Sequence, residues 1–200
     1  KSIDLFMEGA ETELDKTVVE KLNDPLLHLV RNSVDHGVEL PAVRTAQGKN
    51  PTGTITLSAK HVGAFILITI KDDGKGLDRE AIREKGIQRG LIKEDAKLED
   101  AEIYNLIFQP GFSTAKQVTS VSGRGVGLDV VKKDVSTLGG TVSVETEKGK
   151  GSSFILKIPL TLAIIDGMLT TIGKTKYIVP LNTIAECMSF TADKDKKDDL

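Results

Sequence analysis

Four polar side chains with three different chemistries are grouped within residues 23–39, which read NDPLLHLVRNSVDHGVE. The segment holds an imidazole at His28, an amide at Asn32, a carboxylate at Asp35 and a second imidazole at His36. At about 100° per residue, the first three fall on one side of a helix. The other side is apolar and contains Leu26, Leu29, Val30 and Val34. Such a polar face could bind a metal ion or a phosphate, and a merely solvated helix face is the alternative.

Glycine-rich segments follow at residues 72–76 (DDGKG), 123–127 (GRGVG) and 149–151 (GKG). Glycine lacks a Cβ and tolerates positive φ, so it allows the backbone to approach a ligand closely. The second segment leads into an amphipathic pattern, and the free N–H groups of a helix start favour phosphate. Neither the P-loop spacing nor the dinucleotide fingerprint is present. Taken alone, each segment is more typical of a turn than of a site.

In combination these features describe a nucleotide site. Asp72 follows an apolar run at residues 64–71 and could accept hydrogen bonds from a base. Asn32 offers Mg²⁺ a neutral oxygen, and Mg²⁺ often binds through phosphates plus one or two protein oxygens. The helix start at 123–127 would hold phosphates. Residues 109–124 lack periodicity, which favours a loop that closes over the ligand.

The elements that must position these residues can be predicted in order. Helices are expected after Asp15, from an N-cap at Asp24 to Gly37, at 78–90, 100–108 and 128–138, and strands at 2–7, 54–60, 64–71, 141–146 and 152–158. The run at 64–71 suggests a central strand with both faces covered. The segment order predicts an α+β fold, a two-layer sandwich of a mixed β-sheet covered on one face by helices. Pro159 is the expected domain boundary, and a hairpin is expected over 168–179.

Composition excludes several classes of protein. The net charge is -2 and only 4% of the residues are aromatic, which argues against nucleic-acid binding. The single Cys187 excludes an internal disulfide, and one cysteine with three histidines cannot form a zinc cluster. The longest apolar run, 160–172, is too short to cross a bilayer, so a cytoplasmic location is predicted.

The order of the motifs resembles that of the GHKL ATP-binding superfamily, which has the Bergerat fold. The matching stretches are H-x-x-x-N-x-x-D-H-G, DDGKG, FQPGFST, SGRGVGLDVV and GKGSSF, over residues 2–159. Within the superfamily, LLHLVRNSVDHGVE, PGFST and PLTLAI are similar to the chemotaxis histidine kinases of the CheA family. The resemblance implies that residues 1–159 form an ATP-binding kinase domain. It also implies that residues 160–200 begin a truncated CheW-like regulatory domain with an SH3-like β fold.

The resemblance implies a role for each matching residue. The catalytic set would be His28, Asn32 and His36, with Asn32 as the Mg²⁺ ligand. Asp72 would contact adenine, with Ser152 supporting it through water. The remaining ATP-binding residues would be Asp35, His36, Gly74, Lys75, Gly76, Ser113, Thr114, Ser122, Gly123, Arg124, Gly125, Val126, Gly127 and Leu128. For Lys75 and Arg124 an ordinary solvated side chain is an equal alternative.

The implied reaction is transfer of the ATP γ-phosphoryl group to a histidine on a separate phospho-acceptor domain. The gyrase, MutL and heat-shock chaperone branches have a water-activating Glu where this chain has His28, which argues against hydrolysis as the main activity. Implied partners are a CheW-like coupling protein, chemoreceptors, a response regulator and a second copy in a homodimer. Two alternatives stay open: an ATPase that drives a conformational clamp, and a docking scaffold whose nucleotide site is vestigial.

Overall fold

The structure is a computed structural model of the 200-residue chain, and it describes residues 1–112, 127–160, 167–180, 183–184, 186 and 188. The chain divides into two compact units, Lys1–Leu162 and Ala163–Leu200.

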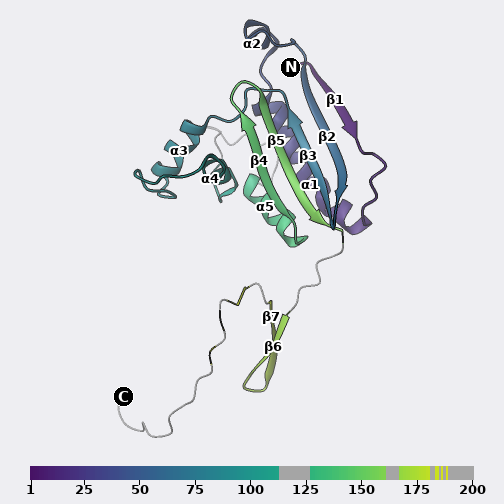
Figure 1. The fold of residues 1–200 in the computed structure, drawn as a ribbon, viewed down its shortest axis with the longest axis vertical. Helices are drawn as coiled ribbons and strands as arrows, with labels where there is room; N and C mark the ends of the chain where they lie inside the picture. Colours follow the sequence, from purple (N-terminus) through teal and green to yellow (C-terminus); the bar gives the residue numbers. More distant parts are fainter. Residues whose placement is uncertain (113–126, 161–166, 181–182, 185, 187, 189–200) are drawn as a thin grey trace. The chain divides into compact units, whose positions relative to one another are not determined.

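The first unit is built on a five-stranded sheet with the order β1-β2-β3-β5-β4 (Figure 1). The strands are β1 (Ile3–Glu8), β2 (Gly53–Val62), β3 (Phe65–Asp72), β4 (Thr141–Glu147) and β5 (Gly151–Pro159). Strand β1 runs parallel to β2, whereas the other neighbouring pairs are antiparallel. The predicted mixed sheet is therefore confirmed, and β3 lies at its centre.

Helices cover one face of this sheet (Figure 1). The two that pack beneath it are α1 (Lys16–Asn32) and α5 (Leu128–Thr137), and they contact each other. A second group near β4 consists of α3 (Arg79–Gln88), α4 (Asp100–Asn105) and the 3₁₀ turn η2 (Leu106–Phe108). The short helix α2 (Pro41–Ala46) connects the α1 region to β2. The predicted α+β class, with helices on one face, is confirmed.

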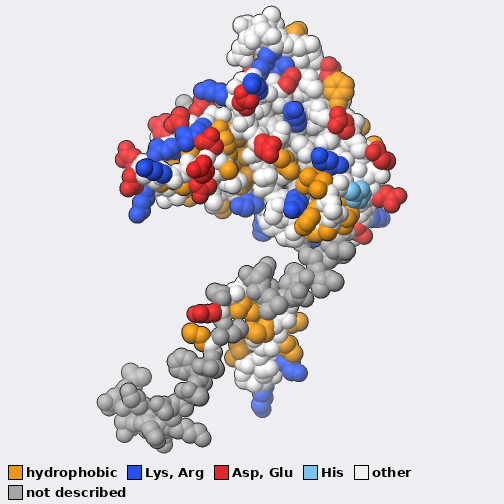
Figure 2. Space-filling view, viewed as in Figure 1, with side chains coloured by type: hydrophobic (Ala, Val, Ile, Leu, Met, Phe, Trp, Pro, Cys, Tyr) orange, Lys and Arg blue, Asp and Glu red, His pale blue; other side chains and the backbone are white. Residues whose placement is uncertain are grey.

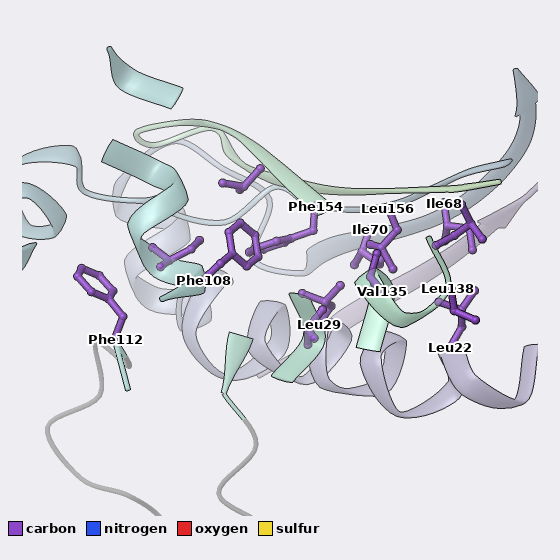
Figure 3. Packing of buried hydrophobic residues seen from close by; sticks show 14 of the residues in the cluster. Leu22, Leu29, Ile68, Ile70, Phe108, Phe112, Val135, Leu138, Phe154 and Leu156 are labelled. Atoms are coloured by element: carbon purple, nitrogen blue, oxygen red, sulfur yellow. The ribbon is translucent and has the colours of Figure 1, made fainter. Parts of the chain in front are cut away.

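The core lies between the sheet and the helices (Figure 3). Side chains from β3 and β5 point toward α1 and α5, as Ile70, Leu156, Leu29 and Val135 show. Along β3, buried residues alternate with partly exposed ones, which is the pattern of a strand covered on one side. The expectation that both faces of this strand are covered is therefore wrong. Its apolar outer residues include Phe65, whose ring carries the Lys157 ammonium 4.0 Å from its centroid.

The expected helix start at Asp24 is also wrong. Helix α1 begins at Lys16, after the Asp15 carboxylate accepts a hydrogen bond from the Thr17 N–H, and it continues through Pro25. The continuous buried stripe Val18, Leu22, Pro25 and Leu29 explains this continuity. Tertiary packing of that stripe outweighs the local preference of proline for a helix start.

Helix α1 ends in a π-helical turn, η1 (Ser33–Gly37). A π turn inserts one extra residue into the helix and is often found at functional sites. Here the Val38 N–H donates to the Ser33 carbonyl, which closes the wide turn over 2.8 Å. The turn places the backbone of Gly37 beside the end of β3.

The second unit contains a β-hairpin of β6 (Gly167–Ile172) and β7 (Thr175–Pro180). This matches the predicted hairpin, and its turn residue Gly173 has a φ of 64°.

Within the described ranges, no helix combines the length and the apolar character needed to cross a lipid bilayer. In the first unit, acidic and basic side chains lie interspersed over α3 and α4 (Figure 2).

Candidate functional site

Asp72 lies at the end of the central strand with its side chain almost completely buried, at 2% exposure. Its Oδ1 accepts hydrogen bonds from the Gly74 N–H at 3.0 Å and the Ser152 N–H at 3.3 Å. Its Oδ2 accepts one from the Ser33 hydroxyl at 3.1 Å. A carboxylate has about four acceptor positions. The three donors therefore leave room on this carboxylate for one further N–H.

Burial raises the pKa of the Asp72 carboxyl above its ordinary value, and the three hydrogen bonds oppose that rise. The charge of neighbouring Asp73 adds to the rise. A buried carboxyl whose pKa is perturbed in this way is a candidate for a functional site.

The backbones of the two glycine segments and the π turn approach one another closely around Asp72. A Cβ added to Gly74 would lie 2.3 Å from the Gly37 carbonyl oxygen, and one added to Gly76 would lie 2.4 Å from that of Glu147. A Cβ on Gly151 would lie 1.9 Å from the Asp72 carbonyl oxygen, and Gly151 has a φ of 111°. Only glycine fits these positions, so the backbone forms a tight cradle at the end of β3.

Only part of the predicted polar face lies on a regular α-helix, and the rest lies on a π turn. His28 and Asn32 lie four residues apart within α1 and share a face, and both are half-buried. Asp35 and His36 lie in the π turn and are exposed. The Lys1 ammonium donates to the carbonyls of Val34 and Asp35, each at 2.8 Å. The structure thus brings His28 and Asn32 together, with Asp35 and His36 on the following turn.

The surroundings of His28 favour its neutral form. Burial lowers the pKa of its imidazole, and the charge of Arg31 lowers it further, while Asp129 at the start of α5 opposes the shift. This interaction places the beginning of α5 within electrostatic reach of the α1 polar face. Gly127 is the N-cap of α5, and Leu128 is its first residue.

The remaining residues predicted at the phosphate end lie outside the described residues. They are Ser113, Thr114, Ser122, Gly123, Arg124, Gly125 and Val126. The same holds for most of the predicted closing loop at 109–124. Its beginning is described: Phe112 is 2% exposed and packs beneath the cationic groups of Lys85 and Arg89.

The geometry agrees with a comparison of the sequence with protein families. A family model described as histidine kinase-, DNA gyrase B-, and HSP90-like ATPase matches residues 20–162. The chain belongs to this ATPase family. The matched range contains Asp72, the polar face of α1 and all three glycine segments. The family resemblance drawn from the order of the motifs is therefore confirmed.

Within the ATPase family, the chain is similar to curated chemotaxis proteins named CheA. The chemotaxis protein CheA of Borreliella burgdorferi is 55% identical over 191 residues, which cover 96% of this chain and 22% of the relative. CheA of Bacillus subtilis is 50% identical over 202 residues, or 100% of this chain and 30% of the relative. The chain thus spans less than a third of the length of these relatives.

A solved structure supports the fold of the ATPase domain. Full-length ShkA in complex with AMPPNP matches with a TM-score of 0.50 and 19% identity, over 80% of this chain and 26% of that chain.

Within this ATPase fold, Ser152 lies against Asp72 as expected, and the contact through water stays a prediction. Its backbone N–H contacts the carboxylate directly, while its hydroxyl lies 3.0 Å from the Thr146 hydroxyl. Thr146 also accepts a hydrogen bond from the Leu77 N–H at 2.9 Å, so it links β4 to the segment after Gly76. The side chain of Lys75 is exposed, and its backbone N–H donates to the Gly37 carbonyl at 3.0 Å.

Two residues of this site were missed in the sequence. Ser33 is 1% exposed and holds Asp72. It lies four residues after Leu29, on the buried stripe of α1, and a polar residue on such a stripe signals a buried partner. Arg44 is also 1% exposed, although its segment, expected to be a loop or a short helix, is rich in turn residues and cations. No local pattern distinguishes it from a surface arginine.

The donor set suits a magnesium ion that arrives with a nucleotide. In the part of the chain that the structure describes, no three histidine, cysteine or acidic side chains gather to hold a metal. The half-buried Asn32 supplies one neutral oxygen, which fits Mg²⁺ bound mainly by phosphates and water.

Proposed function

We propose that the first unit binds Mg²⁺–ATP and transfers its γ-phosphoryl group to a histidine on a separate phospho-acceptor domain. The observation that carries this proposal is the buried Asp72 carboxylate, held by Ser33, Gly74 and Ser152, with one acceptor position left. The family match over residues 20–162 and the identity with CheA proteins support it.

The base would be recognised by Asp72. The 6-amino group of adenine is an N–H donor and suits the remaining acceptor position of the carboxylate. Guanine presents an oxygen at the same place, and an acceptor facing a carboxylate is repelled. The glycines at positions 74 and 76 let backbone segments pack tightly around Asp72, which would fix the direction in which its carboxylate meets the base.

The phosphates would lie toward the polar face of α1 and the start of α5. Asn32 would contribute a ligand to Mg²⁺, and the ion supplies charge neutralisation on the phosphates when it is bound. The other predicted residues of this end, Asp35 and His36, would line it from the π turn. His28 remains neutral, so it can donate one hydrogen bond to a phosphoryl oxygen or orient the incoming imidazole.

In the reaction, a ring nitrogen of the acceptor imidazole forms a bond to the γ-phosphorus. The bond from that phosphorus to the bridging oxygen breaks, and ADP leaves. Catalysis would consist mainly of positioning and electrostatic stabilisation. Position 28 holds a histidine where the hydrolysing branches of the superfamily have a water-activating glutamate, and this difference favours transfer to the acceptor over hydrolysis.

The partners in this proposal are the acceptor domain, a response regulator downstream, a CheW-like coupling protein and chemoreceptors. The β6–β7 hairpin would belong to a CheW-like regulatory domain that residues 160–200 begin. A homodimeric full-length protein and a cytoplasmic location complete the proposal.

Calorimetric titration tests the binding part of this proposal. ATP is titrated into the chain with and without Mg²⁺, and GTP is titrated under the same conditions. We expect ATP to bind, Mg²⁺ to strengthen its binding, and GTP to bind poorly. If no adenine nucleotide binds, the vestigial scaffold is the better description.

A further inference from the structure

Arg44 on α2 is a buried cation, and all of its donors are used. Its Nε donates to the Asn50 carbonyl at 2.6 Å, and one terminal nitrogen donates to the carbonyl of Thr52 at 3.3 Å. The same nitrogen donates to a carboxylate oxygen of Asp73 at 2.8 Å. The other terminal nitrogen donates to Glu39 and to the Asp73 carbonyl, both at 3.2 Å. These five bonds equal the five N–H groups of a guanidinium.

Lys49 contacts two of the same partners as Arg44, the Glu39 carboxylate and the Asp73 carbonyl. Its ammonium donates to Glu39 at 2.9 Å, to the Asp73 carbonyl at 3.0 Å and to the Gly74 carbonyl at 2.7 Å. The cluster is thus Arg44, Lys49, Glu39 and Asp73, with two positive and two negative charges. Burial would raise the pKa values of both carboxyls, but their hydrogen bonds and the two cations hold these pKa values below the ordinary range.

The backbone that this cluster grips belongs to the nucleotide site. Asp73 and Gly74 directly follow Asp72, and the Gly74 N–H donates to the Asp72 carboxylate. On the other side, Gly74 packs against the Gly37 carbonyl, which also accepts from the Lys75 N–H. The segment 73–75 is therefore held between the π turn and the two cations.

Burying charges is expensive, and a well-packed apolar cluster often stabilises a fold as well or better. In this cluster Arg44 and Glu39 are buried, while Lys49 and Asp73 are partly exposed. The two buried charges therefore suggest a role other than stability. Arg44 and Lys49 both donate to the Asp73 carbonyl, which belongs to the same peptide group as the Gly74 N–H that fixes Asp72. Lys49 also donates to the following carbonyl, that of Gly74. Their effect on Asp72 acts through this backbone and without contact to the carboxylate itself.

We infer that Arg44 and Lys49 are positioning residues of the nucleotide site, and that they set the selectivity for adenine by fixing the backbone that orients Asp72. This inference rests on the function proposed above. It concerns the recognition of the base and leaves the phosphate end unaffected. Its signature is a loss of discrimination at the 6-amino group.

The test compares ATP with purine riboside triphosphate, which lacks the 6-amino group. Dissociation constants for both are measured by calorimetry in the parent, Arg44→Lys and Lys49→Met, well below each melting temperature. Arg44→Lys keeps the charge but cannot supply the planar fork of donors. Arg83→Lys on α3 is the control, because Arg83 donates to the Glu94 carbonyl on the surface.

We expect the preference for ATP over the analogue to fall about fivefold in Arg44→Lys and in Lys49→Met, and to stay at the parental ratio in Arg83→Lys. A variant that is merely less stable would keep the ratio, because both ligands would lose affinity equally. An unchanged ratio in both cluster variants, with a clear preference in the parent, overturns the inference alone. A parent that does not bind ATP, or binds both nucleotides equally, contradicts the proposed function instead. If Arg44→Lys does not fold, the ratio in Lys49→Met decides.

Discussion

The Ser33 hydroxyl donates a hydrogen bond of 3.1 Å to the Asp72 carboxylate, which joins the π turn after α1 to the end of β3. The two residues are 39 positions apart in the sequence, and both are almost fully buried. This contact fixes the helix that carries His28 and Asn32 relative to the strand that carries the proposed base acceptor.

Ser33→Ala should weaken ATP binding about threefold to tenfold, because Asp72 loses one of its three orienting donors. The pKa of Asp72 should rise further, since this bond lowers it. Asp72 must be ionised to accept from adenine, so the loss of ATP affinity in acid should move to higher pH. Titrations with ATP at several pH values measure both effects. The control is Ser143→Ala, which alters an exposed serine on β4. Identical pH profiles in parent and Ser33→Ala would contradict the role of this contact.

Asp72→Asn should reduce ATP affinity by roughly 1.5–3 kcal/mol, the usual value of a hydrogen bond to a charged group. The same substitution should leave the stability of the nucleotide-free chain unchanged or raise it. Because burial raises the pKa of Asp72 from 3.8, the folded chain binds a proton more readily than the unfolded chain. The contribution of this carboxyl to the free energy of unfolding therefore falls as the pH rises from 3.8 through the raised pKa.

At neutral pH we thus expect the nucleotide-free Asp72→Asn variant to melt at the parental temperature or above it. This difference should shrink as the pH is lowered. Thermal melts at several pH values, alongside calorimetry with ATP and GTP, give both results. Equal affinity of the parent for ATP and GTP would remove Asp72 from base recognition.

Asn32→Ala should uncouple nucleotide binding from Mg²⁺. The amide of Asn32 is the neutral oxygen donor on the half-buried polar face of α1. The gain in ATP affinity on adding Mg²⁺ is measured in Asn32→Ala and in Asn23→Ala, which alters an exposed asparagine on the same helix. We expect the gain to shrink only in Asn32→Ala. A gain of parental size in both variants would show that Asn32 is not the ligand.

His28→Gln should leave ATP affinity nearly intact and reduce phosphoryl transfer by ~10²–10³-fold, as for the loss of one positioned donor. Because burial lowers the pKa of His28 below 6.5, transfer in the parent should not change with this group above that pH. The rate should fall only in acid, as the imidazole becomes charged. His61→Gln, which alters the exposed histidine on β2, should behave like the parent. Loss of ATP binding in parallel with the rate would make His28 a binding or structural residue.

Much of the fold could be predicted because the local signals agree with the tertiary structure. The Asp78 side chain accepts from the Ala81 N–H and begins α3 as its position suggests. Gly63, with a φ of 59°, turns the hairpin between β2 and β3. At Pro25 the local signal misleads, because a continuous buried stripe carries α1 through the proline.

The site was predictable where glycine and strand patterns converge, as at Asp72, Gly74 and Gly76. The residues that support it were not. Ser33 depends on a partner 39 residues away, and only its place on the apolar stripe of α1 hints at burial. The burial of Arg44 arises from contacts with Glu39, Asp73 and three backbone carbonyls, which only the folded chain brings together.

Incubation with γ-labelled ATP and Mg²⁺, with and without a histidine-bearing phospho-acceptor domain, tests the central proposal most directly. We expect acid-labile, base-stable label on the acceptor, no label on the chain itself, and little release of inorganic phosphate when the acceptor is omitted. An acceptor domain with its histidine replaced by glutamine should remain unlabelled. Steady release of phosphate that is undiminished without the acceptor would contradict the kinase assignment and favour an ATP-driven clamp.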